Sequence, residues 1–315
     1  MKAMPTKTKE TANKIETGEL DMTKDVAVKA EAPPTTTNTG GMDMDLFNKI
    51  KTEPGGGLSK DQADNLVPLI YLLQPLSPQV MKGDPARIEG AEAGDIWLRN
   101  AEKPILKGDK EGMVFQPCYF SKDLVEWMPD RGGFVGRHDI SCLPNVATKK
   151  GWTGTLSDVK EIQDDERPNA PPRYVRSSNN NEIVETRYFV GNVFFEDGRQ
   201  PLPFVIPLSS TGHSFGKQWM FLMNSQALPD GTPIDKSWVV LYRLKTVMKT
   251  NSQGSWYMYT VQKERLINSM QEYELGAALN RAFARGEKKI DDEAMDASAV
   301  GGRPESGSLD NNEPL

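Results

Sequence analysis

Residues Lys236 to Lys263 read KSWVVLYRLKTVMKTNSQGSWYMYTVQK, and the pattern of this stretch decides the expected fold class. Two runs rich in β-branched and aromatic residues, 238–247 and 255–261, flank the polar segment 249–254. Asn, Ser and Gly in that segment tolerate the backbone angles that a tight reversal needs. The stretch therefore predicts a β-hairpin.

Aromatic and cationic residues are interleaved along this hairpin, and no acidic residue interrupts them. Rings and cations on one two-stranded surface suit a single nucleic-acid strand, because bases stack on rings and phosphates pair with cations. The other interpretation is a half-buried hairpin whose rings belong to the core, since aromatic residues are ordinary strand formers. The candidate binding residues here are Trp238, Tyr242, Arg243, Lys245, Trp256, Tyr257 and Tyr259.

Alternation along the first strand separates its side chains onto two faces. Tyr242 falls on one face, and Arg243 and Lys245 fall on the other. If the cationic face is open, stacking beside it requires that Tyr257 and Tyr259 share that face. This depends on the register between the two strands, which the sequence does not give.

The remainder of the chain predicts a mainly β, α+β fold with two or three helices. A second hairpin is expected at 183–195 and 202–208, because EDGRQ at 196–200 is a clear turn. Hydroxyls at 209–211 are suited to cap a helix over about 212–227, and a last helix is expected over about 266–285. Short antiparallel strands with a helix between hairpins suit an OB-like, partly open antiparallel barrel. Further strands are expected at 66–73, 96–99, 112–127 and 134–137.

Composition divides the 315 residues into three parts. Residues 1–57 are predicted to be a disordered tail, with a short helix near 44–51, because they contain too little apolar surface to offset chain entropy. Residues 58–285 are predicted to form a single OB-like nucleic-acid-binding domain with a long loop at about 139–182. Residues 286–315 are predicted to be an acidic disordered tail of net charge −5, although the whole chain carries only −6.

Several classes of protein are disfavoured by the sequence. Two cysteines are too few for a disulfide scaffold, and the first residues lack the apolar core of a signal peptide. The longest apolar run, 66–73, is too short to span a membrane. We therefore expect a cytoplasmic protein, in the host cytoplasm if the chain is phage-encoded, with no membrane contact.

Catalytic motifs for phosphate, dinucleotide, zinc-protease and serine-hydrolase chemistry do not occur in the sequence. We expect no enzymatic activity and no cofactor. Cys118, His138 and Cys142 are weak candidates for a metal site. His213, the other histidine of the chain, could be a fourth ligand. Structural zinc sites normally pair two ligands at short spacing, and only His138 and Cys142 are close here.

The segment Glu126 to His138, EWMPDRGGFVGRH, offers a second contact for an anion. Glycines allow close approach of the backbone, and arginines bind phosphate with two parallel hydrogen bonds. Arg131, Phe134 and Arg137 are the candidates. A hairpin whose glycines only satisfy turn geometry explains the same pattern. Arg167, Arg173 and Arg176 in the long loop can likewise be a phosphate-contacting flap or solvated charges.

Three stretches carry a family resemblance: 66–74, 126–138 and 202–261, the last including IPLSSTGHSFGKQW at 206–219. Their pattern resembles tailed-phage proteins associated with single-stranded DNA binding. A barrel followed by an acidic tail is also similar to the layout of T7-type and bacterial single-stranded DNA-binding proteins. The chain departs from these because its last residues, EPL, include no aromatic residue. The resemblance implies sequence-tolerant binding, no cofactor and self-association.

The hypothesis from sequence is single-stranded DNA binding in phage DNA replication or recombination. The acidic tail would act as an intramolecular competitor, since a tether supplies an effective concentration of roughly millimolar, or as a handle for replication or recombination proteins. The alternatives are a non-enzymatic structural or assembly protein of the virion and a small metal-binding module.

Overall fold

A computed structural model describes residues 66–129, 132–140, 158–162, 173–251 and 254–291, together with Thr52. The chain divides into two units, Met1–Leu58 and Ser59–Leu315, and every element described below belongs to the second. The predicted N-terminal tail at 1–57, its short helix at 44–51 and residues 292–315 of the predicted acidic tail lie outside the described residues, apart from Thr52.

In chain order, the strands of the described part are β1 (Leu66–Val67), β2 (Ile70–Leu72), β3 (Ile96–Leu98), β4 (Ile105–Leu106), β5 (Met113–Trp127), β6 (Phe134–Asp139), β7 (Val159–Ile162), β8 (Arg173–Arg176), β9 (Glu182–Phe194), β10 (Leu202–Ser209), β11 (Val240–Asn251), β12 (Gly254–Leu266) and β13 (Lys289–Ile290). The helices between residues 66 and 291 include α2 (Gly212–Asn224), α3 (Met270–Ala284) and the 3₁₀ helix η4 (Ser237–Val239). The chain is therefore mainly β with two α-helices in this part, as predicted.

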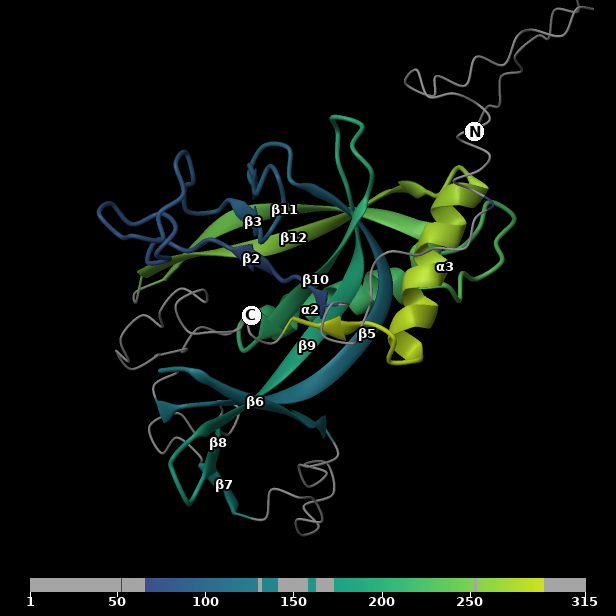
Figure 1. The fold of residues 1–315 in the computed structure, drawn as a ribbon. Helices are drawn as coiled ribbons and strands as arrows, with labels where there is room; N and C mark the ends of the chain where they lie inside the picture. The colour runs from purple at the N-terminus through teal and green to yellow at the C-terminus, as the bar shows by residue number, and fades with distance from the viewer. Residues whose placement is uncertain are drawn as a thin grey trace, which may run out of the picture. The chain divides into compact units, whose positions relative to one another are not determined.

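Two long strands, β5 and β9, organise the main sheet (Figure 1). They pair antiparallel along almost their whole length, from Val114 opposite Phe194 to Trp127 opposite Glu182. At one end β11 joins β5 and β10 joins β9, and at the other end β6 joins β5 and β8 joins β9. Each long strand thus serves both a barrel and an extension made of β6, β7 and β8.

The barrel end curls until β12 and β10 are bridged by the segment around β2. Leu69 forms a parallel bridge with Val205 of β10. The side-chain amide of Gln74 accepts a hydrogen bond from the backbone N–H of Tyr257 in β12 at 2.9 Å and donates one to the Tyr257 carbonyl at 3.1 Å. Because a side chain replaces strand pairing at one joint, the barrel is partly open. The predicted fold class, an OB-like, partly open antiparallel barrel, is therefore confirmed.

The extension corrects the prediction of a long loop at 139–182. Within the described residues of that range, β7 pairs with β8, and β8 pairs with β9 through Tyr174 and Ile183. A small cluster of Leu124, Ile183 and the partly buried Val159 and Tyr174 holds these strands to the long pair. The strands are short and polar, so their own sequence carries little signal.

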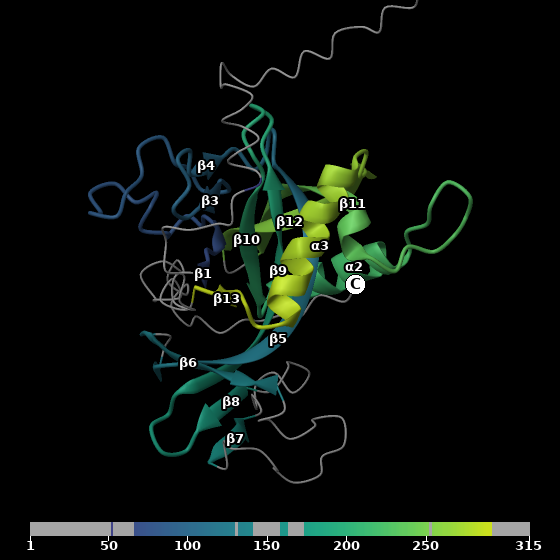
Figure 2. The ribbon, with the colours of Figure 1, turned by 45° about the vertical axis from the view of Figure 1, so that its right-hand side comes forward.

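The C-terminal end also differs from the prediction that 286–315 is a disordered tail. Strand β13 pairs in parallel with β1, and the Ile290 side chain is buried with 5% of its surface exposed. The backbone N–H of Asp291 donates to the Val67 carbonyl at 3.1 Å. Folded structure therefore continues to residue 291, as Figure 2 shows beside β1.

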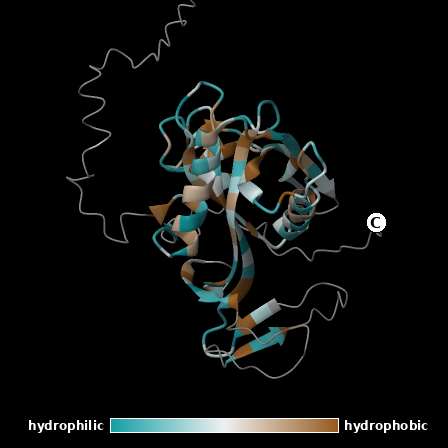
Figure 3. Cartoon of the chain, turned by 90° about the vertical axis from the view of Figure 1, so that its right-hand side faces the viewer, coloured by the Kyte–Doolittle hydropathy of each residue, from teal (hydrophilic) through white to brown (hydrophobic). Residues whose placement is uncertain are grey.

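Two helices cover opposite faces of the β5–β9 pair (Figure 2). Helix α2 inserts Trp219, which is fully buried and stacks on Phe189 of β9 with ring centroids 4.5 Å apart. Helix α3 lies near the other face, where Phe283 stacks on Tyr119 at 5.6 Å. Apolar residues gather between these layers, as the hydropathy colouring of Figure 3 indicates.

The helix ends differ in how they are capped. Thr211 precedes α2 but its side chain makes no capping hydrogen bond, so the predicted hydroxyl cap is wrong for this residue. At α3, the Ser269 hydroxyl accepts from the backbone N–H of Glu272 at 3.2 Å. Serine followed three residues later by glutamate is the sequence signature of a capping box. This places the start of α3 four residues later than the predicted 266.

Candidate nucleic-acid interface

The register of the β11–β12 hairpin decides which side chains share a face. Thr246 lies opposite Tyr259 and Met248 lies opposite Tyr257, whereas Lys249 lies opposite Trp256. Directly opposed residues of antiparallel strands point to the same side. Both tyrosines therefore lie on the face that carries Tyr242, and only Trp256 shares the face of Arg243 and Lys245.

Tyr242 and Tyr259 are core residues. Their exposed fractions are 1% and 8%, and their rings contact Trp219 and Phe215 of α2. Burial raises the pKa of both phenols above the ordinary value. Neither ring is accessible for stacking with a base, and we leave both out of the candidate surface.

Trp238 and Tyr257 are half-buried and hold parts of the fold together. The Trp238 ring meets Tyr273 of α3 edge-on with centroids 6.3 Å apart, and it belongs to η4, outside the hairpin. The Tyr257 ring fills the space beside Gly94, whose φ of +94° and missing Cβ permit this approach. These contacts explain both aromatic side chains without a ligand.

Arg243 is engaged by carboxylates. Its guanidinium binds Glu264 through two hydrogen bonds of 2.8 Å and Glu196 through one of 2.9 Å, and it donates to the Glu111 carbonyl at 2.7 Å. The hydrogen bonds to Glu264 are the main cause of a raised Arg243 pKa. The charge of Arg243 is balanced within the protein, so it offers little to a phosphate.

The rest of this hairpin face forms what we call the outer stripe, made of Lys245, Val247 and Lys249 of β11 and Trp256, Met258 and Thr260 of β12. Lys249 is exposed, and Trp256 and Lys245 are half-buried. Among the described residues, neither lysine ammonium has a hydrogen bond or ion-pair partner. The outer stripe thus presents an indole directly opposite Lys249, with Lys245 four residues further along the same face, and neither lysine charge is neutralised by a direct partner in the described part.

The expected second contact does not adjoin this surface. Strand β6, with Phe134 and Arg137, pairs with β5 at 123–127, whereas β11 pairs with β5 at 113–115. Phe134 packs edge-on against Trp127 at 6.1 Å between centroids, and the Arg137 guanidinium lies 3.5 Å from Asp123 and over the Tyr188 ring. Arg131 lies outside the described residues.

The weak metal candidates are not brought together. Cys118 is buried in β5, where burial raises the pKa of its thiol, and His138 lies opposite Leu124 on the same strand. Six residues of strand separate the two positions, about 20 Å. Cys142 lies outside the described residues, and the His213 ring lies 3.0 Å from the Glu185 carbonyl oxygen. The described residues include no group of three or more potential ligands placed to hold a metal ion.

A pocket that the sequence did not reveal opens beside α2, and we call it the gap pocket. Its volume is about 110 Å³, and its lining is rich in rings and methionines. Phe120, Phe189 and Tyr242 come from the sheet, Met220 from α2, and Ile234 and Lys236 from the segment before η4. These residues are scattered over more than 120 positions, so only the fold assembles them.

Comparison with known protein families gives a match over most of the described part. Residues 38–289 match the family described as Pam3 phage gp34-like protein, which is most of the chain. The chain belongs to this family. The phage origin that the sequence suggested is therefore confirmed, although the family description names no ligand. No curated protein and no solved structure matches the chain.

In this member of the phage family, a buried polar network secures the extension. Glu126, with 3% of its surface exposed, accepts hydrogen bonds from Asn181 Nδ2 at 2.6 Å and Arg176 at 3.1 Å, and its carboxylate lies 2.8 Å from His138 Nε2. Burial opposes the ionised form, but the hydrogen bonds from Asn181 and His138 and the charge of Arg176 hold the Glu126 pKa below its ordinary value.

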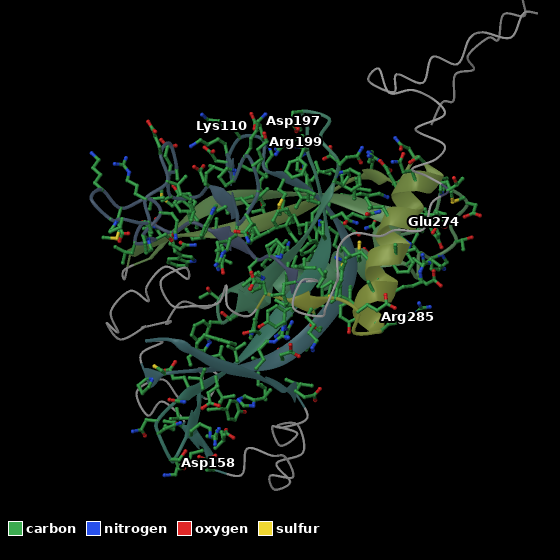
Figure 4. The ribbon with its side chains drawn as sticks, viewed as in Figure 1. Lys110, Asp158, Asp197, Arg199, Glu274 and Arg285 are labelled. Atoms are coloured by element: carbon green, nitrogen blue, oxygen red, sulfur yellow. The ribbon has the colours of Figure 1, made fainter. Side chains whose placement is uncertain are left out.

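Arg176 also binds Asp158 at 2.7 Å, at the outer end of the extension (Figure 4). The sequence pattern allows Arg176 to be a solvated loop charge or part of a flap, because no neighbouring residue in the sequence indicates a partner fifty residues away. The network instead explains Arg176 as a structural residue.

None of the helices in the described part is long and apolar enough to cross a membrane.

Proposed function

We propose that this phage protein binds single-stranded DNA without sequence preference, in phage DNA replication or recombination, and that the outer stripe is the contact surface. The observation that supports this most is the cross-strand register of Lys249 and Trp256 on a face that also carries Lys245. Stacking on an aromatic ring contributes about 1–3 kcal/mol per base and tolerates any sequence. Lys249 beside the ring and Lys245 further along the same face add phosphate contacts and release of counterions.

The proposal uses a smaller set of residues than the sequence suggested. Trp256, Lys245 and Lys249 remain, because the core does not bury their side chains completely and no carboxylate of the described part pairs with the two lysines. Tyr242 and Tyr259 are excluded by burial, and Arg243 is excluded by its ion pairs. We also propose that the protein is neither an enzyme nor dependent on a cofactor.

Fluorescence anisotropy of a labelled oligo-dT tests the proposal at low salt. Trp256→Ala is expected to weaken binding about 5- to 150-fold, the equivalent of one stacked base, and Trp256→Phe is expected to restore part of it. The double variant Lys160→Ala, Lys288→Ala removes one exposed and one half-buried lysine outside the hairpin, as Lys249 and Lys245 are, and serves as the charge control. Absence of binding by the wild-type chain would reject the proposal.

The acidic C-terminal segment enters the proposal as a competitor for the outer stripe or as a handle for partner proteins. Because β13 and Asp291 belong to the folded part, the deletion that tests it removes residues 292–315 and spares 289–291. Tighter binding to oligo-dT is expected, since removing residues 292–315 takes away a net charge of −5. Unchanged affinity would leave only the partner-handle role.

A second candidate function is a structural or assembly protein of the virion. The observation that favours it is the exposure of large apolar side chains, with 76% of Phe221 in α2 and 73% of Met270 in α3 accessible. Purified particles that contain many copies of this chain, combined with no affinity for oligo-dT, would favour assembly over DNA binding.

A further inference from the structure

One edge of β5 is interrupted between its two partner strands. Residues 113–115 pair with β11 and residues 123–127 pair with β6. The intervening residues 116–122 have no strand partner on this edge within the described part of the chain. Pro117, which has no N–H to donate, and a bulge between Pro117 and Tyr119 fall in this interval.

Side chains close this interruption on one side only. The Gln116 amide donates to the carbonyls of Trp238 and Glu272, both at 2.9 Å, and the Asn280 amide of α3 donates to the Cys118 carbonyl at 2.8 Å. Those contacts occupy the side that α3 covers. The side next to α2 is left with the gap pocket.

The gap pocket suits a flat, largely apolar group. The Phe120 and Phe189 rings lie 5.0 Å apart and are tilted by 59°, and Met220 and Ile234 form walls beside them. Phe120, Met220 and Ile234 each retain partial exposure, so the Phe120 ring is accessible from solvent, whereas Phe189 is buried at the base of the pocket. A methionine thioether adapts its shape to a ring and contacts it favourably.

The rim adds positive charge. The exposed Lys122 ammonium lies 6.0 Å from the Phe120 ring centroid, and it has no carboxylate partner among the described residues. Arg187 and Glu185 balance one another at 3.0 Å, and Lys236 and Asp235 do so at 2.8 Å. Lys122 is therefore the cation beside the pocket that has no carboxylate partner among the described residues. A lysine next to aromatic rings matches a ligand with one aromatic group and one phosphate.

We propose that the gap pocket receives one unstacked nucleotide of the bound single strand, with its base against Phe120 and its phosphate near Lys122. This inference rests on the proposed function. It assigns the second DNA contact to the middle of β5 and not to the predicted residues Arg131, Phe134 and Arg137.

Photo-cross-linking of the full-length protein to an oligo-dT that contains 5-iododeoxyuridine tests this placement. Peptides carrying the cross-link are identified by mass spectrometry, and we expect them to include Phe120 as well as Trp256. Cross-links at Trp256 alone would overturn the pocket inference and leave the proposed function standing. No binding of the oligonucleotide at all would overturn both.

A pocket-filling variant gives an independent measurement. Met220→Trp places a large ring in the pocket and is expected to weaken oligo-dT binding at least about fivefold. Gln218→Trp adds the same side chain at an exposed position of α2 and is expected to bind as the wild type does. Equal affinity of the two variants, with equal melting temperatures, would contradict the inference.

Lys122→Ala covers the case in which Met220→Trp fails to fold, because Lys122 is exposed. Removing one phosphate contact to a single strand is expected to reduce the slope of log K against log salt by about 0.7. An unchanged slope and affinity would show that no phosphate lies at this rim. Thymidine monophosphate as a competitor then separates recognition of a free nucleotide from recognition that requires the strand.

Discussion

At the scale of single residues, neighbours along β11 have opposite roles. Tyr242 is buried against Trp219, whereas the adjacent Arg243 reaches two carboxylates on the other face. Two residues further on, Lys245 points to the same side as Arg243 but has no direct partner in the described part. The side of the sheet and the neighbouring charges, more than residue type, therefore decide which cation is available.

This distinction predicts separate effects for two cation substitutions. Arg243→Ala should lower the free energy of unfolding by about 1–2 kcal/mol, because hydrogen bonds between charged groups are lost, and should leave oligo-dT affinity within about twofold. Lys249→Ala should leave the free energy of unfolding nearly unchanged and should weaken oligo-dT binding. Urea unfolding and anisotropy on both variants check this. A larger loss of affinity for Arg243→Ala than for Lys249→Ala would refute the assignment.

Glu126 gives a pH dependence whose direction is fixed by its hydrogen bonds. Its pKa is lowered in the folded chain, so its contribution to stability is present above the unfolded value of about 4.3 and is lost as pH falls through the folded value. Glu126→Gln should cost about 3 kcal/mol at pH 7, because Arg176 and His138 lose a buried anion.

The difference between the wild type and Glu126→Gln should therefore shrink when urea unfolding is repeated near pH 3. Asp158, the other partner of Arg176, also has a lowered pKa, because it accepts hydrogen bonds from Ser178 and Arg176. Asp158→Asn is therefore the control that measures how much Asp158 contributes to the pH dependence of stability. A Glu126→Gln cost that is equal at both pH values would contradict the network.

At the scale of elements, helix α3 approaches η4 closely at Gly276. A Cβ at this position would lie 2.6 Å from the Trp238 Cβ and 2.9 Å from the Gln116 amide nitrogen. Gly276→Ala should therefore destabilise the protein by about 1–2 kcal/mol, although alanine favours a helix by about 1 kcal/mol. Thermal unfolding measures this as a Tm lower by about 2–8 °C.

Gly136 of β6 supplies the matched control. A Cβ at that position would meet nothing within 4 Å, so Gly136→Ala should leave the Tm unchanged or raise it. If both alanine variants melt alike, the close packing of α3 on η4 is not a determinant of stability.

The elements also show where sequence patterns suffice. The hairpin of β9 and β10 was predictable because long apolar strands flank a turn of Gly, Asp and polar residues. Strands β7 and β8 were not, because VKEI and RYVR are short and become strands only when β8 joins the edge of β9 and β7 pairs with β8. The sequence identifies Trp256 as a candidate, but its face depends on pairing with Lys249, and the gap pocket depends on contacts between four distant segments.

At the scale of the whole described part, the two long strands β5 and β9 form the centre of the main sheet. Barrel and extension share β5 and β9, α2 and α3 cover opposite faces, and the interruption of β5 lies between the two sets of partner strands. The outer stripe lies on the hairpin face opposite Tyr242, whereas Tyr242 itself lines the gap pocket. A strand that uses both sites must pass from one face of the sheet to the other.

The most direct test of the central claim is the salt dependence of oligo-dT binding. For the wild type, log K should fall linearly with log salt. The double variant Lys245→Ala, Lys249→Ala should bind more weakly with a slope reduced by about 1.4, since each phosphate contact to a single strand contributes about 0.7. Lys160→Ala, Lys288→Ala should retain the wild-type slope. Identical slopes and affinities for the two double variants would contradict the claim that the outer stripe binds single-stranded DNA.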